Sequence, residues 1–185
     1  MPGELRLDTR VQDVTAGDEA ETLLFALERA RAQFAWKLDG LDAVALRREF
    51  PPSAMTLAGL IKHLALVEEL CVWRDLTGEP PGDPWRLDAF EADPEWEWNS
   101  AQDDSPAALY ALWSSAVAKA RQAWAEALAG GGLDRASRTV RDDGRSPNLR
   151  RVLADLITEY SRHTGHADLF REAIDGLVGE DPPQY

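Results

Sequence analysis

The sequence is poor in cysteine, and this shortage excludes two kinds of structure. Cys71 is the single cysteine among 185 residues, so the chain forms no internal disulfide and no cysteine-rich zinc site. A metal ion must therefore be bound by histidine and carboxylate side chains. Histidine is scarce as well, with three in the whole chain, so their spacing decides where such an ion can bind.

Positive charge and long apolar runs are also scarce. The 20 basic residues face 33 acidic ones, and the net charge of -13 repels nucleic acid and anionic membrane surfaces alike. The first ten residues, MPGELRLDTR, lack the apolar stretch of a secretory signal, and no later segment approaches the roughly 20 apolar residues of a membrane span. We therefore expect a cytoplasmic protein that binds neither nucleic acid nor membranes, folded as a single domain over residues 1–185.

Four stretches show the apolar spacing of three and four residues that is typical of amphipathic helices. The first runs from about Asp18 to Asp39, and the second begins at a cap, Ser53 or Thr56, and ends near Gly78. The third begins at Ser105 and ends before residues 130–132, which are all glycine, and the fourth begins at Ser146, with Pro147 next, and ends at Gly176 or Gly179. Because no stretch alternates convincingly like a strand, we predict an all-α four-helix bundle.

Two connections in this bundle are unusual. Residues 78–104 form a long loop between the second and third helices, and four of its side chains are large aromatic rings: Trp85, Phe90, Trp96 and Trp98. These rings either pack on the bundle as an extra layer or form a lid over a pocket. The second connection, residues 133–145, contains an Asp-Asp-Gly turn and predicts a short extended hairpin.

The fourth helix carries the segment EYSRHTGH, which places three polar groups on one face. At about 100° per residue, Glu159, His163 and His166 fall within roughly 60° of one another, on the side of the apolar stripe. Burying a carboxylate beside two imidazoles is costly unless a cation compensates. Glu159 and His163 supply two ligands from one helix, and His63 on the second helix is the candidate third. Such a set leaves coordination positions open, as in catalytic metal sites.

The residues alone leave other interpretations open. A helical histidine near a core is often hydrogen-bonded instead, and a Glu and a His four residues apart can form a surface pair. His166 can be a fourth ligand, a donor to a ligand or a substrate contact. Asp155 lies one turn before Glu159, where it can orient a ligand or belong to a solvated face.

Two segments, MTLAGLIKHLALVEELCVW and NLRRVLADLITEYSRHTGHADLFREAIDG, make the sequence similar to a known superfamily. It resembles the DinB-like four-helix-bundle metalloproteins, especially the branch with mycothiol-dependent maleylpyruvate isomerase and related thiol transferases. The resemblance implies that His63, Glu159 and His163 hold a divalent metal ion. It leaves His166 outside the coordination sphere, and Asp155 stands where close members often carry histidine. The superfamily's name does not imply DNA binding.

This resemblance leads to our main functional hypothesis, a thiol-dependent transferase or isomerase. A divalent ion deprotonates a thiol of mycothiol or bacillithiol type and so makes it a nucleophile at neutral pH. Zinc is the default ion, and nickel, iron, manganese or cobalt also suit nitrogen and oxygen ligands. Cys71 lies on an apolar stripe, where we expect it to pack rather than react.

Two alternatives use the same residues. One is a metal-dependent hydrolase, in which a bound water replaces the thiol. The other is a non-catalytic protein that binds a metal and a small ligand, or responds to stress, with the tryptophan-rich loop forming the pocket. A homodimer through an apolar helix face stays open, and no local motif names the substrate.

Overall fold

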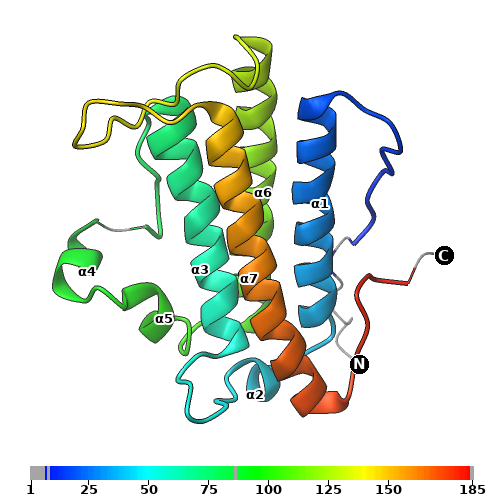
Figure 1. Cartoon of the computed structure of the whole chain (residues 1–185). Helices are drawn as coiled ribbons and strands as arrows, with labels where there is room; N and C mark the ends of the chain where they lie inside the picture. Colours follow the sequence, from blue (N-terminus) through cyan, green and yellow to red (C-terminus); the bar gives the residue numbers. More distant parts are fainter. Residues whose placement is uncertain (1–6, 8, 86, 184–185) are drawn as a thin grey trace.

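Four long helices lie side by side and form the body of the molecule (Figure 1). The structure is a computed structural model that describes residues 7, 9–85 and 87–183. The bundle helices are α1 (Glu19–Leu38), α3 (Leu57–Leu70), α6 (Pro106–Ala129) and α7 (Leu149–Asp175). The described residues contain no strand, so the predicted all-α fold is confirmed. Nor does any helix in this part of the chain have the length and apolar character needed to cross a membrane.

Most helix ends lie where the capping residues predict them. Asp18 accepts a hydrogen bond from the backbone N–H of Glu21, whose side chain reaches back to Asp18, so that a complete capping box begins α1. Thr56, rather than Ser53, caps α3, and Ser105 caps α6. Gly176 ends α7 with a φ of 80°, a left-handed conformation that glycine adopts without strain.

The predicted start of the last helix, with Ser146 as cap, is wrong. The side chain of Asn148 caps α7 by accepting a hydrogen bond from the backbone N–H of Arg151. The carbonyl of Pro147 accepts a hydrogen bond of 2.8 Å from the N–H of Ser137. Pro147 therefore belongs to the connection that crosses the end of the bundle, and the helix begins two residues later.

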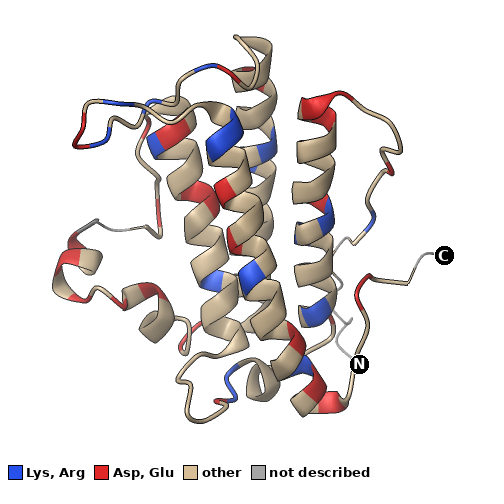
Figure 2. Cartoon of the chain, viewed as in Figure 1, with Lys and Arg blue, Asp and Glu red and all other residues tan. Residues whose placement is uncertain are grey.

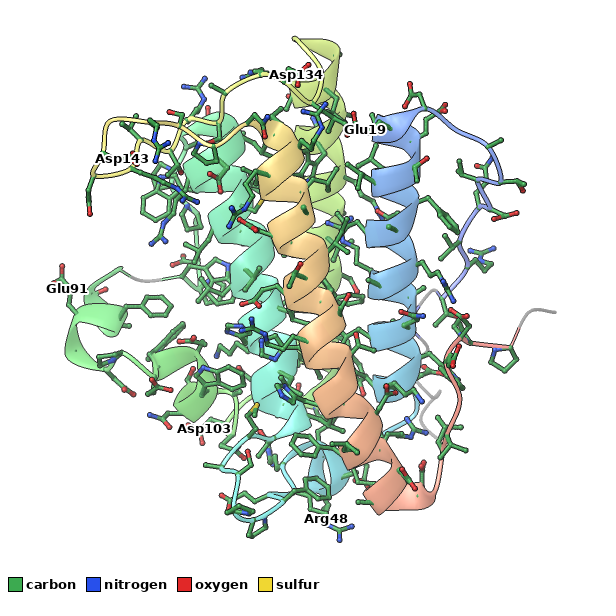
Figure 3. All side chains as sticks on the ribbon, in the orientation of Figure 1. Glu19, Arg48, Glu91, Asp103, Asp134 and Asp143 are labelled. Carbon is green, nitrogen blue, oxygen red and sulfur yellow. The ribbon has the colours of Figure 1, made fainter. Side chains whose placement is uncertain are left out.

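The predicted hairpin in that connection is also wrong. The turn is present, with the N–H of Arg141 bonded to the carbonyl of Arg145 at 2.9 Å, and Asp143 in Figure 3 marks its place. Only one isolated bridge, between Ala136 and Asn148, pairs this segment, and a single bridge is no ladder. The segment lies over the ends of α3 and α7 as an irregular connection (Figure 1).

Shorter helices fill the other connections. They are α2 (Ala43–Leu46), a π-helical turn η1 (Cys71–Thr77) that continues α3, α4 (Leu87–Ala92) and α5 (Trp96–Ser100). The last two form in the tryptophan-rich loop and carry acidic residues without Lys or Arg (Figure 2). Of these, α5 packs on α3, and α4 stands farther out from the bundle (Figure 1). Trp85 is 5% exposed and meets Trp96 edge to face, with ring centroids 6.3 Å apart. The loop's rings thus pack as an extra layer.

A buried polar network joins all four long helices. Arg31 on α1 donates two hydrogen bonds, of 2.8 and 2.7 Å, to the carboxylate of Glu68 on α3. The hydroxyl of Tyr160 on α7 donates to the same carboxylate at 2.7 Å, and the indole N–H of Trp113 on α6 donates to that hydroxyl at 2.9 Å. Each of the four residues is at most 5% exposed, so the network lies inside the core.

We expect Arg31→Met to lower the free energy of unfolding by about 3–5 kcal/mol, because it leaves the Glu68 carboxylate buried without its cation. Urea denaturation followed by circular dichroism measures this loss. The double variant Arg31→Met/Glu68→Met should regain most of it, since no buried charge remains. The exposed pair of Arg145 and Asp143 gives the control, because Arg145→Ala should change stability by no more than about 0.5 kcal/mol. A loss below about 1 kcal/mol in Arg31→Met would contradict the prediction.

Candidate metal centre

The three predicted metal ligands lie together between α3 and α7. His63 on α3 and Glu159 and His163 on α7 each offer one nitrogen or oxygen atom, and these atoms all lie within 4.8 Å of one another. His63 lies 96 positions before Glu159 in the sequence, so two distant helices bring the group together. The structure shows that they meet, and their role as metal ligands stays a prediction.

The surroundings of His63 fit the role of a metal ligand. Both ring nitrogens are buried, and neither has a hydrogen-bond partner among the described residues. A buried polar atom without a partner costs free energy, and such atoms are rare in folded proteins. The alternative of a hydrogen-bonded core histidine therefore finds no support at His63. A metal ion would give one of these nitrogens the partner that it lacks.

His163 is suited to give a lone pair at neutral pH. Burial, together with the smaller effect of positive charge on His63, His166 and Arg162, lowers its pKa to about 4. The imidazole is consequently neutral at pH 7, which is the state that binds a metal. The Glu159 side chain is 32% exposed, and its Oε2 atom lies 3.8 Å from Nη1 of Arg162. Its carboxylate is thus available to a cation on the other side.

The two predicted neighbours of the site lie in different surroundings. The Nδ1 atom of half-buried His166 is 3.3 Å from the Nδ1 atom of His163, so one ring can hold the other in place. The carboxylate of Asp155 accepts hydrogen bonds of 2.6 and 2.7 Å from Arg151, and its side chain is 54% exposed. Its contacts are therefore those of a helix-surface pair.

Two further residues lie at the site, both on α5: Trp98, which the sequence placed in a packed layer or a lid over a pocket, and Glu97, which the sequence analysis did not identify. The ring of Trp98 stacks on His63 with centroids 4.7 Å apart and planes inclined by 21°. The Oε1 atom of Glu97 lies 3.6 Å from Nδ1 of His63, and Glu97 is 8% exposed. The available signal was an acidic residue between two tryptophans, Trp96 and Trp98, in a loop too long to be a simple connection.

A cavity of about 530 Å³ opens beside Glu159, between α3, η1, α7 and the connection before α7. Its volume is in the range of small-molecule sites. The π-helical turn contributes to its wall, and such turns are frequent at functional sites. The wall combines apolar side chains with three arginines and three carboxylates: Val67, Leu70, Val152, Leu156, Arg74, Arg141, Arg162, Asp75, Asp155 and Glu159.

Cys71 also lines this cavity, but it is poorly suited to react. It is 7% exposed, and burial raises the pKa of its thiol well above the usual range. The negative charges of Glu68 and Asp75 raise the pKa further. The thiolate, which is the reactive form, is therefore disfavoured.

Comparison with known proteins identifies the family. The model of a family described as MST, mycothiol-S-transferase, matches residues 22–176, which include all four long helices apart from the first turn of α1. The chain therefore belongs to the mycothiol S-transferase family. No curated protein matches the chain.

We expect His63→Ala and His163→Ala each to lose most of the bound metal, because each removes one of three ligands. His166→Ala is the matched control and should retain most of it, since its ring contacts His163 from outside the group of three. Elemental analysis by mass spectrometry, with metal reported per chain, measures this. Full metal content in His163→Ala, or complete loss in His166→Ala, would show that the ligands are assigned wrongly.

Proposed function

From this family membership we propose that the protein is a metal-dependent thiol transferase or isomerase that uses mycothiol or a similar low-molecular-weight thiol. The observation that carries the proposal is the group of His63, Glu159 and His163, of which Glu159 also lines a cavity of ligand size. The family supports a thiol as the small-molecule partner.

His63 and His163 would supply two neutral nitrogen donors, and Glu159 would supply one negative oxygen donor. When bound, a divalent ion lowers the pKa of a coordinated thiol below its free value of about 8.5, so that thiolate forms at neutral pH. Zinc suits this donor set, as do nickel, iron, manganese and cobalt.

The cavity beside Glu159 has room for the thiol and for the molecule that receives it. Val67, Leu70 and Leu156 cover apolar parts of these molecules, and the arginines contact polar or anionic groups. In the transfer, the thiol sulfur forms a bond to an electrophilic carbon. The leaving group departs with its bonding electrons, and the thiol proton passes to solvent. The chain holds both molecules and orients the sulfur.

We expect the metal-loaded protein to form a sulfur-carbon adduct from mycothiol and monobromobimane faster than the reaction without protein, as measured by liquid chromatography and mass spectrometry. His163→Ala should lose about tenfold or more of this acceleration, because the thiol then keeps its free pKa of about 8.5 and is mostly protonated at neutral pH. Glu126→Gln, at an exposed position on α6, should keep the wild-type rate.

The same assay separates the alternatives. No acceleration of adduct formation with any of a panel of electrophiles, and no binding of the thiol, would refute thiol transfer. Turnover of ester, amide or phosphoester substrates without thiol would indicate a hydrolase instead. Tight binding of a metabolite without chemical change would indicate a non-catalytic binding protein.

The cavity gives a further prediction. We expect Thr158→Trp to lower kcat/KM by about tenfold, because Thr158 lines the cavity and its replacement fills space that the reactants need. Ala154→Trp, one turn earlier on α7 and exposed, is the matched control. Steady-state kinetics at equal metal content measure the difference. Equal kcat/KM values in the two variants would place the reactants elsewhere.

A further inference from the structure

The short helix α5 lies outside the bundle, yet it places two consecutive side chains against His63. Trp98 covers the face of the imidazole, and Glu97 approaches its Nδ1 atom, with Oε1 at 3.6 Å. Among the described residues, Glu97 thus brings its carboxylate closest to Nδ1 of His63.

The burial of Glu97 is compensated only in part within the described part of the chain, by the approach of its Oε1 atom to His63. Its Oε2 atom is buried and lacks a hydrogen-bond partner among the described residues, as do both ring nitrogens of His63. Asp93, four residues earlier, shows the usual arrangement, since its carboxylate accepts hydrogen bonds from Asn99 and from the N–H of Glu95. A buried carboxylate oxygen without a hydrogen-bond partner costs free energy, so a function beyond the stability of the fold is the simplest reason to keep Glu97.

We propose that Glu97 is a positioning residue of the metal centre, which holds the Nδ1–H of His63 and leaves Nε2 for the ion. This inference rests on the metal centre of the proposed function. A movement of about 0.7 Å would bring Glu97 from 3.6 Å to an ordinary hydrogen-bond distance of about 2.9 Å. Metal-binding histidines commonly donate their second N–H to a carboxylate, which fixes the ring and makes it a better ligand.

Charge balance supports the same assignment. His63 and His163 are neutral donors, so Glu159 alone leaves a divalent ion with one uncompensated positive charge in a half-buried site. Glu97 supplies the second negative charge without being one of the grouped ligands. The site then becomes neutral overall, which lowers the cost of holding the ion away from water.

The packing of α5 on α3 keeps this arrangement in place. Gly59 lies one helical turn before His63, and a Cβ atom there would come within 2.7 Å of the Trp98 ring. Glycine therefore gives Trp98 the room to lie flat on His63. The ring excludes water from that side, and the attraction between Glu97 and His63 is stronger in the drier surroundings.

The test compares Glu97→Gln, which keeps the shape and removes the charge, with Glu95→Gln, an exposed neighbour just before α5. Zinc affinity is measured by competition with a chromophoric chelator, and the stability of the metal-free protein by urea denaturation. We expect Glu97→Gln to weaken zinc binding by about 10- to 100-fold and Glu95→Gln to leave it unchanged. The metal-free Glu97→Gln protein should be as stable as the wild type or more so, because an incompletely compensated buried acid is gone.

These opposite effects separate positioning from a structural role. Zinc affinity within twofold of the wild type in Glu97→Gln would overturn the inference, and so would a loss of affinity that accompanies a less stable metal-free protein. Neither result depends on turnover. A protein that binds zinc with the expected Glu97 dependence but transfers no thiol would refute the proposed activity and leave this inference standing.

Discussion

The buried ion pair between Arg31 and Glu68 is the interaction on which the position of the site depends. Removing two charges from water is tolerable only when both partners and their hydrogen bonds are in place, so this pair disfavours sliding of one helix past another. Tyr160 donates a hydrogen bond to Glu68, and Glu159 is the residue immediately before Tyr160 on α7. We infer that the relative position of α3 and α7 that gives Glu68 its hydrogen-bond partners also places Glu159 opposite His63.

A second group of buried polar atoms lies close by and, unlike the first, lacks hydrogen-bond partners in the part of the chain that the structure describes. The network around Glu68 is satisfied by the chain itself, whereas both ring nitrogens of His63, five residues earlier on the same helix, have no partner among the described residues. Folded proteins rarely keep such atoms without a functional reason. Within the described residues, the unpartnered atoms of His63 and Glu97 thus lie close together, beside the helix that also carries Glu68 and its satisfied network.

The parts of this structure that sequence predicted well are those governed by local spacing. Periodicity and capping residues defined α1 and α6, and the step of four residues placed Glu159 and His163 on one face. Arg31 and Glu68 could not be assigned to the core, because a charged residue is buried only when a distant partner meets it. The start of α7 is predicted too early for a similar reason. The carbonyl of Pro147 accepts a hydrogen bond from the connection before the helix, and the local sequence does not reveal that partner.

The arrangement around Cys71 explains why the reactive sulfur has to come from outside the chain. Its side chain lies in the wall of the cavity, but burial and the charge of Glu68 both raise the pKa of its thiol. The carboxylate that joins the helices thus also keeps the chain's own sulfur protonated. In the proposed function the reactive sulfur would therefore belong to a thiol that enters the cavity, and His63, Glu159 and His163 would supply nitrogen and oxygen ligands that do not compete as nucleophiles.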